Sequence, residues 1–300
     1  MLANPVLRLL AGAALISFSP VFVALVSVSS TNSAFYRVAI GGVILTGWML
    51  ATGGWRRPRA AVFTMLLLGA VCFALDLWFW HKSIIYVGPG LATLLANFQV
   101  FVMTAAGFVL LGQRPTVAQL ISIPMALAGL GLIVGVDWSV LSAEYRLGVI
   151  FGLATAACYA AYLLCFRHAQ SMSRSLPTAL PVRELAIVSL ASAAFLAGVA
   201  GVEGESLAIP TLKDAGWLVA YALFAHIFGW LLIASSLAHV PAALIGLSLL
   251  IQPLLSFVWD VLLFDRPVTT PEVAGAALAL VAIYLGARQP GRNGRNRAVG

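Results

Sequence analysis

Long apolar runs separated by short polar segments occupy nearly all of this 300-residue chain. Ten runs can be laid down, each close to the roughly 20 residues that a membrane-spanning helix needs. Their approximate limits are 6–28, 33–52, 60–82, 89–111, 116–136, 146–168, 178–200, 213–236, 241–263 and 271–288. The first run is too long, and too well matched by the later ones, to be a cleaved signal peptide. The pattern therefore predicts an all-α membrane protein with ten transmembrane helices.

A stretch of the first half reappears in the second half, displaced by 152 positions. Pro89 then coincides with Pro241, Trp78 with Trp230, and Arg114-Pro115 with Arg266-Pro267, each Arg-Pro following a Val-Leu-Leu run. Chance similarity between apolar helices is the alternative, but the shared Arg-Pro favours a repeat. Five spans per copy would invert the second copy relative to the first, which is typical of alternating-access transporters. We expect two inverted five-helix repeats, over 1–138 and 146–288, and a basic cytoplasmic tail over 289–300.

Composition supports a membrane protein, and charge sets its orientation. Hydrophobic residues make up 62% of the chain and charged residues 9%, against roughly 45–50% and 25% in soluble domains. With the N-terminus inside, the interior segments hold eleven basic residues and the exterior segments four, as the positive-inside rule requires. The interior set is Arg8, Arg56, Arg57, Arg59, Arg114, Arg167, Arg174, Arg288, Arg292, Arg295 and Arg297; the exterior set is Lys82, Arg146, Lys213 and Arg266. The net charge of +7 is thus topological, which argues for contact with membrane lipid and against a nucleic-acid partner, and both termini are expected to be cytoplasmic.

Ionisable side chains inside apolar spans are costly, so they are candidates for function. The third span contains Asp76, Trp80 and His81; Asp76 and Trp80 are four residues apart and share a helix face. An acid beside an indole and an imidazole suits an amphipathic molecule that bears an amine. Anchoring at the membrane border is the alternative, and it is the reading we adopt for Trp78 and Lys82.

Two arginines occupy mirrored places in the predicted halves. Arg37 lies near the outer end of the second span, and Arg183 near the inner end of the seventh. They are candidates for two gates or for steering a carboxylate, and snorkelling to the interface is the equally weighted alternative.

The remaining candidates lie at mid-membrane depth. His226 and Trp230 are four apart in the eighth span, where His226 is either a neutral structural histidine or a proton sensor. Asn97 is a polar group in the fourth span that either lines a path or joins helices, and Gln99 and Gln252 raise the same alternatives. The three cysteines lie in spans, and we predict no disulfide, no metal site and no cofactor.

Aromatic residues recur in the lead helix of each predicted half. Phe18 lies in the first span, and Tyr159 and Tyr162 lie in the sixth. The positions correspond roughly between the halves, which suggests a shared cavity wall, although aromatic residues facing lipid are also common.

These features together resemble the drug/metabolite transporter superfamily, in its EamA-domain branch. The residues that carry the resemblance are Ser19-Pro20, Arg37 followed by small residues, the stretch Asp76 to Ile84, and Gln113-Arg114-Pro115. Within the branch, the layout is similar to the YddG-like aromatic amino acid exporters. The resemblance implies a location in the bacterial inner membrane, export of small metabolites, and a central cavity lined by spans of both halves.

The sequence thus predicts an exporter of amino acids, aromatic ones in particular, or of similar small amphipathic metabolites, working by alternating access. Asp76 would meet the substrate ammonium or a coupling proton, and protons are a candidate partner. The alternative is a drug or quaternary-cation carrier of the same superfamily. The chain has no Gly-x-Ser-x-Gly, no His-Glu-x-x-His and no paired membrane aspartates, which argues against an intramembrane enzyme.

Overall fold

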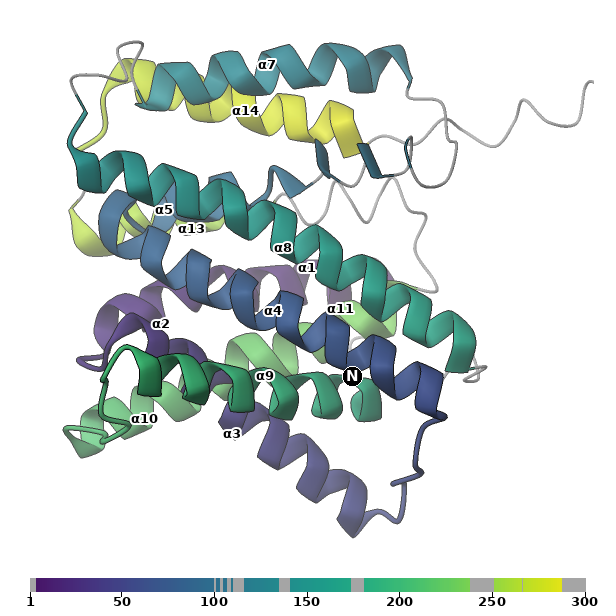
Figure 1. Ribbon diagram of the computed structural model, residues 1–300. Helices are drawn as coiled ribbons and strands as arrows, with labels where there is room; N and C mark the ends of the chain where they lie inside the picture. Colours follow the sequence, from purple (N-terminus) through teal and green to yellow (C-terminus); the bar gives the residue numbers. More distant parts are fainter. Residues whose placement is uncertain are drawn as a thin grey trace, which may run out of the picture.

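The computed structural model describes residues 4–99, 101–102, 105–106, 109, 116–134, 141–173, 181–237, 251–265 and 267–287. Within this part of the chain the regular structure is entirely helical (Figure 1). The helices are α1 (Pro5–Ser17), α2 (Ser19–Leu25), α3 (Ser30–Ala51), α4 (Ala60–Val87), α5 (Pro89–Ala96), α7 (Val117–Val134), α8 (Ala143–Ser173), α9 (Val182–Val202), α10 (Leu212–Tyr221), the π-helix η1 (Ala222–Phe228), α11 (Gly229–Leu237), α13 (Ile251–Phe264) and α14 (Thr270–Ala287). The predicted tail, 289–300, lies outside the described residues.

Among the described residues, six helical segments are long and apolar enough to cross a membrane, and three shorter apolar helices accompany them. The six are Pro5–Leu25, Ser30–Ala51, Ala60–Val87, Ala143–Gln170, Val182–Val202 and Leu212–Ile233. Each falls on one of the predicted runs, with ends that differ by up to about five residues, as expected for helix boundaries. The shorter helices, Leu120–Leu132, Ile251–Phe264 and Thr270–Leu285, also coincide with predicted runs.

Three of the predicted spans are interrupted rather than continuous. The first breaks at Phe18, after which Pro20 opens α2 because a first-turn proline needs no hydrogen-bond partner. Pro89 begins α5, as predicted, and that helix ends at Ala96, with Asn97 as its C-cap. The eighth changes from α10 into the π-helix η1 and then into α11. Such interruptions expose backbone and redirect side chains, and they recur at functional sites of membrane proteins.

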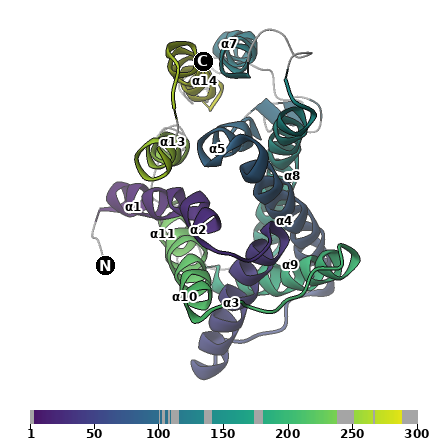
Figure 2. The ribbon, with the colours of Figure 1, turned by 90° about the vertical axis from the view of Figure 1, so that its left-hand side faces the viewer.

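Helices from the two halves of the chain pack against one another in pairs. Pairs of this kind include α3 with α9, α5 with α13, α7 with α14, α4 with α8, and α1 with α11. Seen end-on in Figure 2, α7 and α14 lie at one extreme of the molecule and α3 at the other. The first three pairs join spans that the predicted repeat makes equivalent, and a two-fold axis would exchange the last two pairs.

Glycine allows α8 to approach α4 and α5 closely. A Cβ added to Gly148 would lie 2.5 Å from the Cβ of Tyr86, and one added to Gly152 would lie 2.6 Å from Cδ1 of Leu95. Contacts this short exclude a side chain at either position. Small residues serve membrane helices in this way because lipid provides little hydrophobic force between them.

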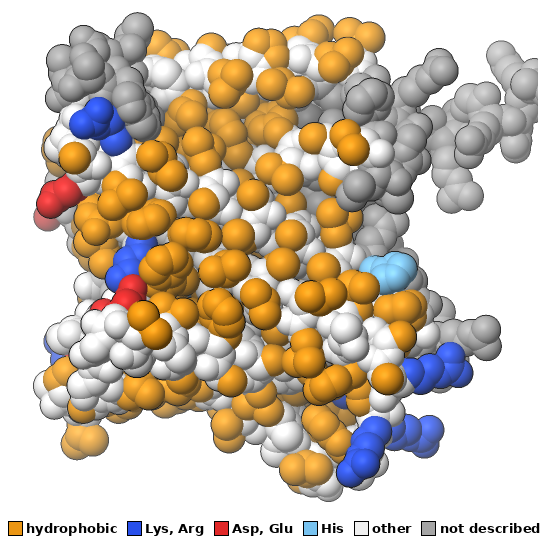
Figure 3. Space-filling model, in the orientation of Figure 1, with side chains coloured by type: hydrophobic (Ala, Val, Ile, Leu, Met, Phe, Trp, Pro, Cys, Tyr) orange, Lys and Arg blue, Asp and Glu red, His pale blue; other side chains and the backbone are white. Residues whose placement is uncertain are grey.

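The described surface is dominated by apolar side chains. In Figure 3 hydrophobic side chains cover most of the visible face, and charged side chains gather toward two opposite edges. Large apolar residues such as Val43, Leu50 and Leu262 are more than 60% exposed. A soluble protein rarely exposes so continuous an apolar surface, whereas a lipid bilayer would cover it.

Candidate functional site

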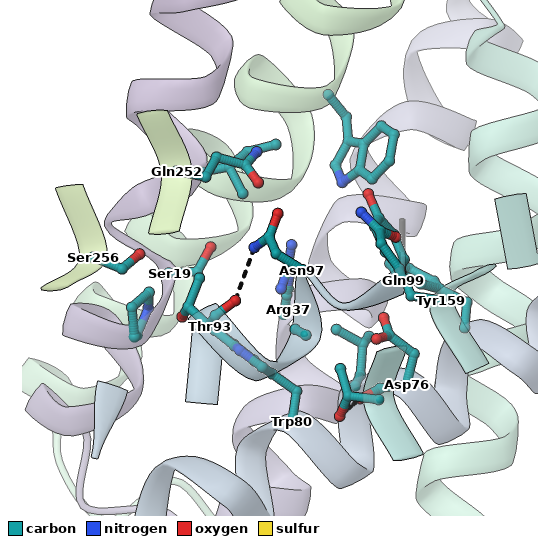
Figure 4. A pocket seen from close by; sticks show the side chains of 17 residues that line it. Ser19, Arg37, Asp76, Trp80, Thr93, Asn97, Gln99, Tyr159, Gln252 and Ser256 are labelled. Atoms are coloured by element: carbon teal, nitrogen blue, oxygen red, sulfur yellow. Dashed lines mark hydrogen bonds between the residues drawn. The ribbon is translucent and has the colours of Figure 1, made fainter. Parts of the chain in front are cut away.

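A cavity of about 90 Å³ lies among helices of both halves of the chain. Its polar and aromatic lining comes from the α1–α2 break, α3, α4, the end of α5, α8, α11 and α13. These side chains are Ser19, Arg37, Phe73, Asp76, Trp80, Thr93, Asn97, Gln99, Thr155, Tyr159, Trp230, Gln252 and Ser256. In Figure 4, Gln252 and Ser256 point in from one side, and Gln99, Tyr159 and Asp76 from the other.

A second cavity, of about 150 Å³, lies between α5, α13 and α14. Its lining side chains, which include Leu94, Phe257 and Leu280, are all apolar. It therefore offers no group that could orient a polar solute, and we take the first cavity as the candidate site.

Arg37 supplies the positive charge of the site. Its side chain is only 5% exposed, and its Nη1 donates a hydrogen bond to the hydroxyl of Tyr221 over 3.0 Å. The guanidinium carbon lies 5.0 Å from the centroid of the same ring. The Nε–H of Arg37 is buried and has no hydrogen-bond partner among the described residues. The guanidinium therefore has hydrogen-bond donors that a ligand could use.

Asp76 supplies the carboxyl group of the site. It is 7% exposed and lies on α4. Thr155 donates to its backbone carbonyl over 3.4 Å, which joins α8 to α4. Among the described residues, neither Asp76 nor Arg37 takes part in an ion pair within 4.0 Å. The cavity is thus lined by a basic and an acidic side chain that form no direct ion pair.

Aromatic rings form another part of the wall. Trp80 follows Asp76 by one turn of α4, while Tyr159 lies on α8 and Trp230 on α11. The rings of Tyr159 and Trp230 meet edge to face, with centroids 6.4 Å apart. Rings at this distance and angle form a stable apolar surface on which another flat or apolar group can pack.

Amide side chains complete the lining near the end of α5. Asn97 Nδ2 donates to the carbonyl of Thr93 over 2.8 Å, which leaves its other amide positions for the cavity. The Oε1 of Gln99 is buried without a partner among the described residues. These groups can accept or donate one hydrogen bond each to a small solute.

The structure gathers six of the predicted residues in the cavity wall: Arg37, Asp76, Trp80, Asn97, Tyr159 and Trp230. Five others lie elsewhere. His81, Tyr162 and His226 are almost completely buried outside the lining, and the ring of Phe18 stacks on Trp259 with centroids 4.6 Å apart. Arg183 lies at the start of α9, where its Nη2 is 2.5 Å from Oε1 of Glu184.

His226 is held within the packed helices. Its Nε2 lies 2.8 Å from the hydroxyl of Ser189, and its ring leaves no room for a side chain at Gly41, where a Cβ would come within 2.4 Å. Tyr162 stacks on Phe73, with centroids 4.5 Å apart. Because Phe73 itself lines the cavity, Tyr162 supports the wall from behind.

The sequence reasoning missed several groups. Thr93, Thr155 and Ser256 line the cavity, yet a hydroxyl residue in an apolar run gives little signal, because it can bond to its own helix. Asp260 was also missed, although a carboxylate inside a predicted span should have been noticed. It is buried, and its Oδ2 accepts a hydrogen bond from the backbone of Gly90 over 3.1 Å at the N-terminus of α5.

The site contains no obvious place for a metal ion. No group of three His, Cys, Asp or Glu side chains that could hold one is found in the described ranges. Cys72, Cys158 and Cys165 are free thiols. The side chains that line the cavity can bind a small solute by charge, hydrogen bonds and aromatic contact.

A family model decides the identity of the fold. The model of the EamA-like transporter family matches residues 4–135 and matches again at residues 146–287. The chain belongs to the EamA-like transporter family. This places it in the drug/metabolite transporter superfamily, as a multi-pass membrane protein of a transporter family.

A solved crystal structure is similar to this EamA-like chain over nearly its whole length. The TM-score is 0.65, and the match covers 95% of this chain and 98% of the other. The two sequences are 18% identical, so this likeness shows the fold alone. No curated protein matches the chain.

Proposed function

We propose that this EamA-like protein is a bacterial inner-membrane exporter of amino acids, aromatic ones in particular, or of similar small amphipathic metabolites. The observation that carries the proposal is the cavity in which Arg37 and Asp76 face a common space beside three aromatic rings. A zwitterion with an apolar side chain complements each of these features. Asp76 would pair with its ammonium, and Trp80, Tyr159 and Trp230 would contact its side chain.

The absence of an ion pair between the two charges supports a ligand that bridges them. A buried charge without an opposite charge beside it is costly, and a ligand that brings the opposite charge to each group would remove that cost. An amino acid brings one charge of each sign. A quaternary cation, which is the second candidate, would satisfy Asp76 and the rings but would be repelled by Arg37.

Cavity size also favours a small solute. Drug-sized ligands usually occupy pockets of about 300–1,000 Å³, whereas this cavity has about 90 Å³. Bulky drugs would need a much larger rearrangement of the helices than amino acids would.

Alternating access is supported by the relation between the halves of the chain. The family model matches each half separately, and the contacting helix pairs are those that a two-fold axis would produce. We propose inverted repeats over 1–138 and 146–288, with both termini cytoplasmic. In this arrangement the cavity opens in turn to each side as one half rocks against the other.

The two predicted gates differ in their support. Arg37 lines the cavity, so contact with the solute explains its position better than a gate does. Arg183 lies at the start of α9, and its Nη1 donates to the carbonyl of Arg56 in the α3–α4 connector over 3.5 Å. We keep the inner-gate role for Arg183, and we keep proton coupling through Asp76 as part of the hypothesis.

The test is transport by purified protein in proteoliposomes. Labelled tryptophan, phenylalanine, threonine and an aliphatic quaternary cation would be loaded and their flux followed, with and without an imposed pH gradient. The proposal predicts saturable flux of the aromatic amino acids, competed by one another. Flux of the cation alone would favour the second candidate, and absence of amino-acid flux would contradict the proposal.

A further inference from the structure

Three buried side chains form a hydrogen-bonded chain that ends at the cavity. Nη1 of Arg37 lies 3.0 Å from the hydroxyl of Tyr221, and that hydroxyl lies 3.3 Å from Nε2 of His81. The other ring nitrogen of His81, Nδ1, lies 2.7 Å from the carbonyl oxygen of Leu77. These hydrogen bonds join α3, α10 and α4. Of the three side chains, only Arg37 lines the cavity.

Donors and acceptors fix the direction of every bond in this chain. A carbonyl oxygen only accepts, so Nδ1 of His81 carries a hydrogen, and in the neutral ring Nε2 is left as an acceptor. The Tyr221 hydroxyl must therefore donate to His81. Its oxygen is then free to accept from Arg37, whose guanidinium can only donate.

Rigidity follows from burial. Tyr221 and His81 are both 0% exposed, so water does not compete for these bonds. Tyr221 is the last residue of α10, immediately before the π-helix η1. π-Helical turns are rare and are frequent at functional sites. Here the turn lies directly beside the residue that contacts the arginine.

The hydrogen bond to Tyr221 uses only one of the N–H donors of the Arg37 guanidinium. One hydrogen bond goes to Tyr221, while the buried Nε–H of Arg37 has no partner among the described residues. A planar guanidinium with free donors matches a carboxylate, which accepts two parallel hydrogen bonds. Asp76 faces the same space but forms no ion pair with Arg37 within 4.0 Å, so it leaves these donors open to the carboxylate of a solute.

We propose that Arg37 binds the carboxylate of the transported solute, and that Tyr221 and His81 are positioning residues that hold its guanidinium toward the cavity. This rests on the proposed function, and it narrows the substrate class to solutes that carry a carboxylate. Asp76 and the aromatic rings then bind the other end of the solute. An amine without a carboxylate leaves Arg37 unpaired and binds weakly.

The experiment compares labelled phenylalanine with its decarboxylated analogue, 2-phenylethylamine, as a competitor in proteoliposomes. Tyr221→Phe removes one hydroxyl and keeps the ring. It should raise the KM for phenylalanine about tenfold, the effect of losing one hydrogen bond to a charged group, with kcat nearly unchanged. Inhibition by the amine should stay as in the wild type.

Further variants separate positioning from general structural damage. His81→Leu removes the acceptor and should act like Tyr221→Phe, whereas His81→Gln restores an acceptor oxygen and should recover part of the KM. Arg37→Lys keeps the charge but loses the planar guanidinium that can donate two parallel hydrogen bonds. It should raise the KM for phenylalanine at least as much as Tyr221→Phe does. Tyr86→Phe is the matched control, because Tyr86 lies on α4 with its ring packed against Phe151, outside the cavity lining.

The outcomes distinguish this inference from the proposed function. If the wild type does not transport phenylalanine, the proposed function fails and this inference fails with it. If the wild type transports phenylalanine and Tyr221→Phe leaves its KM unchanged, only the inference is overturned. The same holds if the variant lowers the apparent affinity for phenylalanine and for the amine equally, because a merely structural role would affect both.

Discussion

In the connector Glu203–Thr211, between α9 and α10, the carboxylate of Glu203 has three partners, whereas in the cavity the charges of Asp76 and Arg37 form no ion pair among the described residues. Oε1 of Glu203 lies 3.1 Å from Nζ of Lys82 and accepts from Nε1 of Trp78 over 3.1 Å. Its other oxygen accepts from the hydroxyl of Thr31 over 2.6 Å.

The rest of the connector continues this pattern. Glu205 accepts a hydrogen bond from Ser29, and Asn32 donates to the carbonyl of Ser206 over 2.7 Å. Asp214, just beyond the connector, accepts from the backbone of Ser27 over 2.8 Å. Together these contacts fasten the connector to the beginning of α3 and to the end of α4.

The difference indicates two uses of charge in one apolar protein. Charges that have partners on neighbouring elements hold the fold together, and removing one costs stability. Charges that are buried without an opposite charge beside them destabilise the fold and are retained for a ligand. Substitutions in the connector and the cavity should therefore have opposite signatures in stability and transport.

The largest effect is expected for Asp76→Asn, which keeps the shape of the side chain and removes its charge. Transport of amino acids, measured as kcat/KM in proteoliposomes, should fall about 100-fold, the effect of losing roughly 3 kcal/mol of charge-assisted binding. The melting temperature should stay the same or rise, because an unpaired buried charge has been removed. Wild-type transport, or a large fall in melting temperature, would place Asp76 with the structural charges instead.

The aromatic wall should show a smaller and selective effect. Trp80→Leu should raise the KM for tryptophan and phenylalanine about tenfold through lost ring contact, and should change the KM for threonine much less. Trp48→Leu is the control, because Trp48 is 49% exposed on α3 and does not line the cavity. An equal change for all three amino acids would argue against ring contact with the substrate.

The connector should respond in stability rather than in binding. Glu203→Gln weakens the ion pair with Lys82 and the hydrogen bonds from Thr31 and Trp78, costing about 1 kcal/mol after discounting for partial exposure. The melting temperature in detergent should fall by about 3 °C, with KM unchanged. Glu144→Gln, on an exposed residue in the first turn of α8, is the control. A raised KM in Glu203→Gln would link the connector to the binding site.

The smallest effect is expected in the pH dependence of the stabilisation that Glu203 provides. Burial raises the pKa of Glu203, but hydrogen bonds from Thr31, Lys82 and Trp78 and the charge of Lys82 outweigh it, so the pKa lies below its ordinary value of 4.5. The stabilisation is therefore complete above pH 4.5 and is lost as the pH falls through the lowered pKa. The difference in melting temperature between wild type and Glu203→Gln should be present at about pH 6 and should shrink steadily below about pH 4. A constant difference would exclude titration of Glu203 as its source.

The sequence predicted the helices better than the directions in which their side chains point. Apolar length alone located the helical runs, because every spanning helix must satisfy its backbone within lipid. The same property hides the orientation of each helix, since lipid-facing and protein-facing sides are both apolar. His81 illustrates this, because it follows Trp80 directly yet points away from the cavity toward Tyr221.

The sequence also predicted the interruptions of the helices poorly. Pro89 marked the start of α5, but no residue pattern predicted that α5 would end at Ala96 or that η1 would follow Tyr221. Tyr221 was therefore never a candidate, although it contacts Arg37 directly. Arg37 was expected near the outer end of its span, as a gate or a group that steers a carboxylate, and the structure places it in the cavity lining. The sequence gives depth along a helix but not the packing around it.

The most direct test of the central claim measures binding to the purified protein, independent of transport. Labelled phenylalanine bound to the wild type would be displaced by unlabelled phenylalanine and by two analogues. The first analogue, 2-phenylethylamine, lacks the carboxylate, and the second, 3-phenylpropionate, lacks the amine. If Arg37 and Asp76 bind the two ends of a zwitterion, each analogue should compete at least about tenfold more weakly than phenylalanine. Arg37→Met should remove the disadvantage of the amine, and Asp76→Asn that of the acid. Competition by either analogue as strong as by phenylalanine in the wild type would contradict the account.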